Sequence, residues 1–262
     1  MIAQCYLEFC ERLWHDWRAK PSALTGVEPL RFQPDHVPEP YLRFEDGKNP
    51  LFVLLTNPGK GKYREQEREA ITEGRSCIRP DMSYYEISAE LGRFYLGRLQ
   101  GAAATRIHKM YRLLRPTRSD CIVQFESLPF HSAKLPHKKA IPELIESTPT
   151  LRDYSMALAE ALKGFLVIAL SAVDTSHSID VAAIHRSPWL KWQVEKILGI
   201  ADTNRLKQID LTTKKNTGYV TSAFLYERVG EHIRGIVLMM GGNAFPGDDG
   251  FEKLAEVLAE RT

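Results

Sequence analysis

The sequence predicts a three-layer α/β/α sandwich with a mainly parallel central sheet. Two unbroken apolar runs, residues 51–55 (LFVLL) and 165–170 (FLVIAL), are typical of strands that are buried on both faces. Segments with apolar residues at helical spacing lie between such runs, and this alternation favours a parallel sheet covered on both sides by helices. We therefore expect one α/β domain over residues 1–262, with its core in residues 50–262 and residues 1–49 packed on it.

The first predicted element is an amphipathic helix over residues 2–17, because its apolar residues, among them Tyr6, Leu13 and Trp17, recur at helical spacing. Residues 21–49 contain five prolines and no sustained period, which predicts an irregular surface segment. The run 51–55 follows as a buried strand, and the sequence Thr-Asn-Pro-Gly at 56–59 ends it in a turn.

The rest of the chain continues the alternation of helices and strands. Two helices are predicted over residues 83–114, with a break near Gly101, and a strand over residues 118–126. A helix over 150–162 precedes the strand 165–170, and a helix over 188–198 precedes the last strands, 206–211, 219–226 and 235–240. A helix over 250–261 closes the chain. Strand, helix and strand form a right-handed crossover unit, and the late strands are expected to add antiparallel pairs.

Composition and charge exclude several classes of protein. The 35 Lys and Arg residues nearly balance the 33 Asp and Glu residues, so a histone-like basic protein is excluded and any nucleic-acid surface must be local. Four cysteines without a C-x-x-C pair argue against a zinc ribbon and a disulfide framework, so a reducing, cytoplasmic setting is expected. The longest apolar stretch, 164–173, is about half of what a bilayer span needs, so we expect a cytoplasmic protein without a membrane span or signal peptide.

Four segments are expected to hold the functional site, because ligands of open α/β sheets gather at the carboxyl ends of the strands. These segments are residues 56–63, 126–139, 171–188 and 241–247. A P-loop is excluded, because Thr56 and Tyr63 stand where that motif needs Gly and Ser or Thr. No G-x-S-x-G nucleophile elbow is present, and the histidine spacings do not match H-E-x-x-H. We therefore expect neither a metal nor a cofactor.

The end of the first buried strand resembles the first motif of the uracil-DNA glycosylase superfamily, in particular the branch that acts on mismatched uracil and thymine. The residues that carry the resemblance are Leu54, Leu55, Asn57, Pro58 and Gly59. The resemblance implies the α/β/α fold of that superfamily, DNA as the partner of a monomeric enzyme, and release of a flipped base that leaves an abasic site. Asn57 matches the position of the residue that places the attacking water.

The chain departs from the family in its second motif. The family's His-Pro-Ser type loop after the last parallel strand is not present as such, since residues 185–189 (HRSPW) are a degenerate version and residues 241–246 lack a histidine. His185 or Asn243 is therefore expected to donate a hydrogen bond to the departing base.

A glycosylase also needs basic groups on the flanking phosphates, an aromatic platform for the base and a wedge to fill the gap in the stack. The candidate DNA contacts are Lys60, Lys62, Lys134, Lys138, Lys139 and Asn243. The expected substrate pocket consists of Thr56, Pro58, Gly59, Tyr63, Phe125, Glu126, Phe130, His131 and Ser132, in which the aromatic residues are the candidate stacking partners. Trp189 or Phe245 is the candidate wedge, although Trp189 and Trp192, three apart on a predicted helix, also fit core positions.

The turn also bears on the substrate. Uracil-specific members of the superfamily carry a tyrosine shortly after the motif's proline, which blocks substituents on carbon 5, whereas Gly59 and Gly61 occupy that neighbourhood here. The resemblance therefore implies room for a 5-substituted cytosine, such as glucosylated hydroxymethylcytosine in phage DNA, and a role in antiviral defence. Three alternatives stay open: a repair enzyme for mismatched uracil or thymine, a non-catalytic nucleic-acid-binding module, and a small-molecule hydrolase or nucleotide-binding enzyme.

Overall fold

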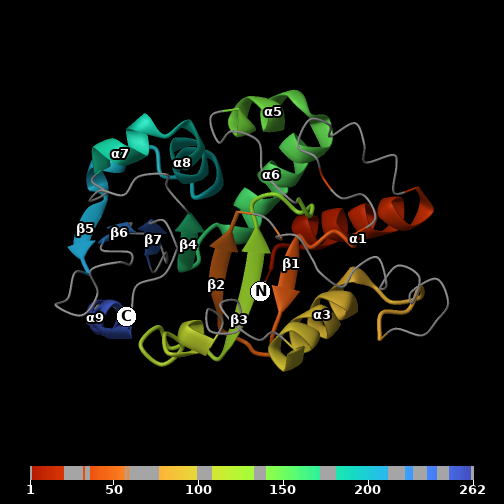
Figure 1. Ribbon diagram of the computed structural model, residues 1–262, viewed down its shortest axis with the longest axis horizontal. Coiled ribbons are helices and arrows are strands. Elements are labelled where there is room, and N and C mark those ends of the chain that lie inside the picture. Colours follow the sequence, from red (N-terminus) through yellow and green to blue (C-terminus); the bar gives the residue numbers. More distant parts are fainter. Residues whose placement is uncertain are drawn as a thin grey trace.

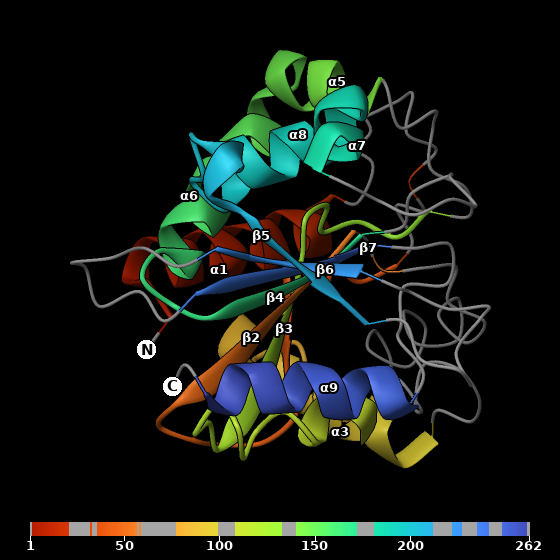
Figure 2. The same ribbon diagram turned by 90° about the vertical axis from the view of Figure 1, so that its left-hand side faces the viewer.

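The computed structural model describes residues 2–20, 32, 36–56, 58, 77–98, 108–132, 140–171, 181–211, 222–226, 235–240 and 248–260. These residues form three layers, with one sheet between two layers of helices (Figures 1 and 2). One helical layer contains α1 (Gln4–Ala19), α5 (Ile141–Ser147), α6 (Pro149–Leu162), α7 (Val181–Arg186) and α8 (Pro188–Trp192). The other contains α3 (Tyr84–Arg98) and α9 (Asp248–Ala259).

The sheet has seven strands in the order β1-β3-β2-β4-β7-β6-β5. Their bounds are β1 Tyr41–Arg43, β2 Pro50–Leu55, β3 Cys121–Glu126, β4 Val167–Ser171, β5 Lys207–Asp210, β6 Ser222–Tyr226 and β7 Ile236–Met240. The strands β3, β2, β4 and β7 are parallel, whereas β1 pairs antiparallel with β3, and β6 pairs antiparallel with β5 and β7. The α/β class and the late antiparallel strands predicted from the sequence are thus confirmed.

The apolar strands form because both of their faces are covered. Leu51 to Leu54 of β2 are almost completely buried, and the Phe52 ring lies 5.0 Å from the Phe125 ring of β3 and 4.6 Å from that of Phe165. A strand that alternates polar and apolar residues would expose one face, which this position in the sheet does not allow.

Four short elements differ from the sequence-based prediction. Residues 41–43 were expected in an irregular segment but form the edge strand β1, whose register aligns Tyr41 with Phe125. The helices α5 and α7, of seven and six residues, were not predicted, because so few residues carry little helical periodicity. The helix predicted over 188–198 is α8 followed by a π-helical turn, Gln193–Ile197.

The helix α1 covers the β1 side of the sheet and packs against α6 and α3. Tyr6, Trp14 and Trp17 face the core, as their helical spacing predicts. The indole of Trp14 donates a hydrogen bond to Met82 O, so α1 also fixes the segment that leads into α3. None of the helices within the described residues is long and apolar enough to cross a membrane.

The strand order defines where a ligand can bind. β2 lies between β3 and β4 in the sheet. The chain passes from β2 to β3 on one side of β2 and then crosses to β4 on the other side of β2, so the direction of winding reverses between β2 and β4. In doubly wound sheets the crevice outside the carboxyl ends of the strands at such a reversal is the ligand site. The carboxyl ends of β2 and β3 lie at the same edge of the sheet, and β1 points the opposite way (Figure 1). We call this side the carboxyl edge.

Candidate functional site

The segments that follow β2 and β3 lie against each other at the carboxyl edge. The amides of Ser127 and Leu128 donate hydrogen bonds to the carbonyl oxygens of Leu55 and Thr56, both at 2.9 Å. Further along, the Ser132 amide lies 3.4 Å from Pro58 O. Two of the four segments selected from the sequence, 56–63 and 126–139, are therefore in contact at Thr56 and Pro58.

Polar side chains are buried at this junction, although such residues are ordinarily exposed. Glu126, Ser127, His131 and Ser132 are at most 4% exposed. Glu126 Oε1 accepts a hydrogen bond from Gln124 Nε2 at 2.9 Å. Glu126 is the last residue of β3, and its carboxylate can accept hydrogen bonds, while the His131 imidazole five residues later has one ring nitrogen that can donate and one that can accept.

Glu39 and His131 form a buried acid–imidazole pair. His131 Nε2 lies 3.4 Å from Glu39 Oε1, and the Tyr95 hydroxyl of α3 donates to the same oxygen at 2.6 Å. The His36 ring packs beside the His131 ring, with centroids 5.4 Å apart. Three separate parts of the chain, the segment before β1, helix α3 and the segment after β3, thus meet in one cluster. His36, Glu39 and Tyr95 were not predicted as site residues, because His36 and Glu39 lie in a Pro-rich segment without a motif and Tyr95 has the spacing of a core residue.

A second polar contact reaches the end of β2 from the helical layer. Gln193, which is 1% exposed, donates from Nε2 to Ser127 Oγ at 2.9 Å, and Ser127 Oγ donates to Leu55 O at 2.9 Å. Gln193 begins the π-helical turn, a backbone form that is frequent at functional sites. No described residue provides a hydrogen bond to its Oε1, which is buried. No motif in the sequence identifies this residue.

Two tyrosines support the junction from the α1–α6 side of the sheet. Tyr154 OH lies 2.5 Å from Glu126 O, and Tyr6 OH donates to Pro40 O at 2.9 Å. The two hydroxyls are 3.1 Å apart. Burial raises the pKa of both phenols well above the ordinary value, so both stay protonated and act as donors at neutral pH.

The other predicted residues within the described part of the chain are in different surroundings. Thr56 is half-buried and Pro58 is buried at the carboxyl edge, and the buried Phe130 ring lies 5.0 Å from that of Phe32. Phe125, a predicted stacking partner, instead faces the core, with its ring 5.6 Å from that of Tyr6 and none of its surface exposed. Its neighbour Glu126 takes the opposite face, because successive strand residues alternate.

His185 also differs from its expected place. The sequence makes it a candidate donor to the departing base, as part of a degenerate version of the family's loop motif, but it is exposed on α7, and its Nε2 lies 2.7 Å from Thr203 Oγ1. That hydrogen bond directs the ring to the 203–205 turn rather than to the Ser132–Pro58 junction. Trp189 is a core residue, 1% exposed and stacked on Trp192 with ring centroids 5.4 Å apart, so it does not fit the role of a wedge.

Ten predicted site residues lie outside the described residues and stay predictions. They are Asn57, Gly59, Lys60, Lys62, Tyr63, Lys134, Lys138, Lys139, Asn243 and Phe245.

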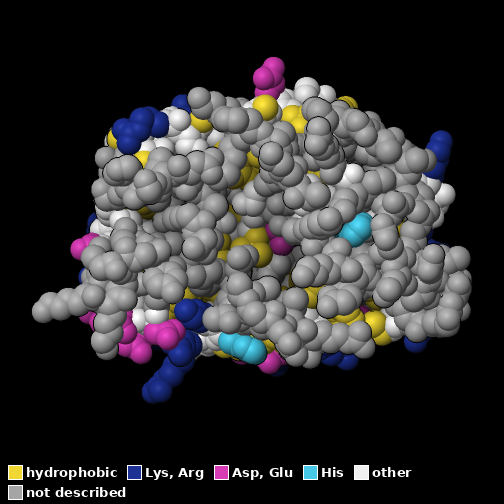
Figure 3. Space-filling view, in the orientation of Figure 1, with side chains coloured by type: hydrophobic (Ala, Val, Ile, Leu, Met, Phe, Trp, Pro, Cys, Tyr) yellow, Lys and Arg dark blue, Asp and Glu magenta, His cyan; other side chains and the backbone are white. Residues whose placement is uncertain are grey.

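The space-filling view shows the same side of the molecule as Figure 1. Near the middle of this face, in the region where the strands β2 and β3 end in Figure 1, hydrophobic and acidic side chains of described residues are visible (Figure 3).

Comparison with known proteins adds no relative. No protein-family model matches the sequence, and neither the curated proteins nor the solved structures yield a match.

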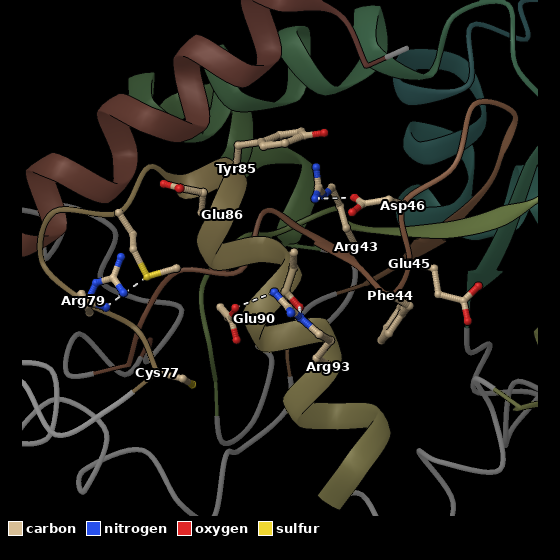
Figure 4. Close-up of a pocket in the computed structure, with 12 residues that line it drawn as sticks. Arg43, Phe44, Glu45, Asp46, Cys77, Arg79, Tyr85, Glu86, Glu90 and Arg93 are labelled. Atoms are coloured by element: carbon tan, nitrogen blue, oxygen red, sulfur yellow. Dashed lines mark hydrogen bonds and ion pairs between the residues drawn. The ribbon is translucent and has the colours of Figure 1, made fainter.

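A pocket of about 550 Å³ lies elsewhere, between α3, the segment before it and the residues that follow β1 (Figure 4). Arg43 lies over the Tyr85 ring, 3.6 Å from its centroid, and its Nη2 is 2.8 Å from Asp46 Oδ1. Arg93 pairs with Glu90 at 2.5 Å. The charges in this pocket therefore largely neutralise one another. Because β1 runs antiparallel to β3, the pocket lies toward the amino end of the parallel strands, away from the carboxyl edge.

Proposed function

We propose that the protein is a monofunctional DNA glycosylase, related to the uracil-DNA glycosylase superfamily, that flips a modified pyrimidine into the carboxyl edge and excises it. The observation that carries the proposal is the contact of the Ser132 amide with Pro58 O. This contact joins Pro58, part of the Asn-Pro-Gly sequence that carries the family resemblance, to the segment that contains the buried Glu126 and His131. The contact lies at the carboxyl edge, where the direction of winding reverses between β2 and β4.

These groups suit the chemistry of base release. Cleavage of the bond between base and deoxyribose develops positive charge on the sugar and negative charge on the base. In the proposal, Asn57 places a water under the sugar, while Glu126 accepts a hydrogen bond from an exocyclic amino group such as that of cytosine. His131 replaces His185 as the imidazole nearest to the base, because it lies at the carboxyl edge whereas His185 is directed to Thr203.

The substrate class follows from the turn. In the family resemblance Gly59 and Gly61 stand near the position of the tyrosine that blocks carbon 5 in uracil-specific members. We therefore propose that 5-substituted cytosines, such as glucosylated hydroxymethylcytosine of phage DNA, are the preferred substrates. Antiviral defence is the corresponding biological role. Repair of mismatched uracil or thymine uses the same site with a smaller base.

The test is release of bases from oligonucleotides that contain uracil, a thymine mismatch, hydroxymethylcytosine or its glucosylated form. We expect abasic sites on at least one substrate. Asn57→Ala should lower the rate at least about a hundredfold with DNA binding retained, because only the positioning of the water is lost. Asn204→Ala, at an exposed position of the turn 203–205, is the matched control and should leave the rate unchanged. An unchanged rate in Asn57→Ala would contradict the proposal.

The second candidate function is a nucleic-acid-binding module without chemistry. It is favoured by the placement of His185, the histidine of the degenerate second motif, at an exposed position of α7, where its ring contacts Thr203. This function predicts DNA binding that weakens steeply with salt and no abasic sites on any substrate.

A further inference from the structure

Glu39 lies 92 positions before His131 in the chain, yet the two side chains meet in the interior. Glu39 is 3% exposed and His131 1%. A carboxylate is rarely buried to this degree unless it is paired and hydrogen-bonded, because removing a charge from water is costly. Here the Tyr95 hydroxyl at 2.6 Å and His131 Nε2 at 3.4 Å stabilise the carboxylate.

The contacts continue from this pair to the Asn-Pro-Gly turn. The backbone amide of Glu39 donates to Pro129 O at 2.7 Å, two residues before His131. Ser132 follows His131 directly, and its amide contacts Pro58 O. Glu39 therefore holds the 129–132 segment by its backbone and by its side chain, and that segment in turn contacts the residue next to Asn57.

We propose that Glu39 is a positioning residue for the glycosylase site: through His131 it fixes the segment 129–132 against the Asn-Pro-Gly turn and so sets where Asn57 places the water. The proposal rests on the proposed function. Tyr95 shares the task, because it donates to the same carboxylate oxygen and anchors it to α3.

The Glu39 carboxylate is not needed to hold the backbone of its own segment, so its contact with His131 can be tested separately. The segment 36–40 lies just before the edge strand β1, and its carbonyl oxygens are already held by Tyr6 at Pro40 and by Tyr84 at Pro38. The backbone of the segment is thus fixed without the carboxylate. Glu39→Gln retains the size and one acceptor oxygen of the side chain but removes its charge, so it weakens the contact with His131 and leaves these anchors in place.

The experiment compares Glu39→Gln, His131→Gln and the double variant with wild type in single-turnover base release. We expect each single variant to lower the single-turnover rate constant about tenfold to a hundredfold, with DNA Kd within about twofold, because a small displacement of positioning groups costs this much rate. The double variant should be no slower than the slower single variant, since both substitutions break one contact. Glu160→Gln, an exposed partner of Lys163, is the control and should behave as wild type.

A second readout does not depend on activity. Hydrogen exchange of the Ser132 amide, followed by NMR, should become faster in Glu39→Gln and in Tyr95→Phe but not in Glu160→Gln, because the contact with Pro58 O loosens. An unchanged rate constant and unchanged exchange in Glu39→Gln would overturn the positioning role. A rate loss with unchanged exchange, or with unfolding, would also overturn it. If wild type releases no base, the proposed function fails, and the exchange of Ser132 alone decides whether Glu39 holds the segment.

Discussion

Four buried tyrosines are expected to make this protein unfold at alkaline pH. Burial raises the pKa of Tyr6, Tyr41, Tyr84 and Tyr154 above the ordinary tyrosine value of about 10. The unfolded chain loses these protons near pH 10, whereas the folded protein retains them. The stability that these groups contribute is therefore fully present below about pH 10 and is lost as the pH rises toward their folded-state pKa values.

The size of the effect follows from proton linkage. Each tyrosine that is protonated in the folded state and ionised in the unfolded state lowers the free energy of unfolding by about 1.4 kcal/mol for each pH unit. Four such groups together amount to about 5 kcal/mol for each unit above pH 10. Because domains of this kind are stable by about 5–15 kcal/mol, unfolding is expected within about one to three pH units above 10.

The assay follows the ultraviolet absorbance of tyrosinate and circular dichroism in one pH titration. At least four of the ten tyrosines should ionise only together with the loss of secondary structure. Tyr154→Phe removes one of the four groups, so the free energy of unfolding should fall less steeply with pH. At neutral pH the variant should be less stable by about 1–3 kcal/mol, because Glu126 O loses its buried donor. Ionisation of all ten tyrosines in a folded protein near pH 10 would refute the reasoning.

Two further predictions concern residues outside the carboxyl edge. Gly92→Ala should lower the free energy of unfolding, measured in urea, by about 1–3 kcal/mol. A Cβ at this position would lie 2.0 Å from Arg43 O, so α3 would have to move away from β1. An equal or higher stability of the variant would contradict this close packing. The amides of Lys48 and Asn49 donate to the Asp120 carboxylate and lower its pKa, so its contribution is present above about pH 4 and is lost as the pH falls further. Asp120→Asn should therefore show a smaller drop in Tm between neutral and acidic pH than wild type, and equal drops would count against it.

The sequence was sufficient for the parallel strands because their signal is local. β2 and β4 are apolar runs, and β3 is rich in strand-forming residues (CIVQFE), so the type of each can be assigned without knowing its neighbours. The edge strand β1 has three residues and lies among prolines, so nothing in its own sequence distinguishes it from a loop. Its conformation is set by pairing with β3, a partner about 80 residues away.

The site residues that directly follow a strand could be predicted from the sequence, whereas those that join the site through long-range contacts could not. Pro58, Glu126, His131 and Ser132 were selected because they follow buried strands. Glu39 enters the site only through contacts with Tyr95 and His131, which no sequence spacing indicates. The misplacement of Phe125 was avoidable, because a strand of period two cannot turn both Phe125 and Glu126 to one face.

The position of β2 in the sheet also affects how the chain reaches its folded state. Both of its neighbours, β3 and β4, lie later in the chain, by about 70 and 115 residues, so its pairing requires the closure of long loops. Until β4 pairs, one side of the apolar strand LFVLL offers unpaired backbone groups to any other chain. Folding intermediates that contain β2 and β3 without β4 are thus the species most exposed to aggregation during synthesis.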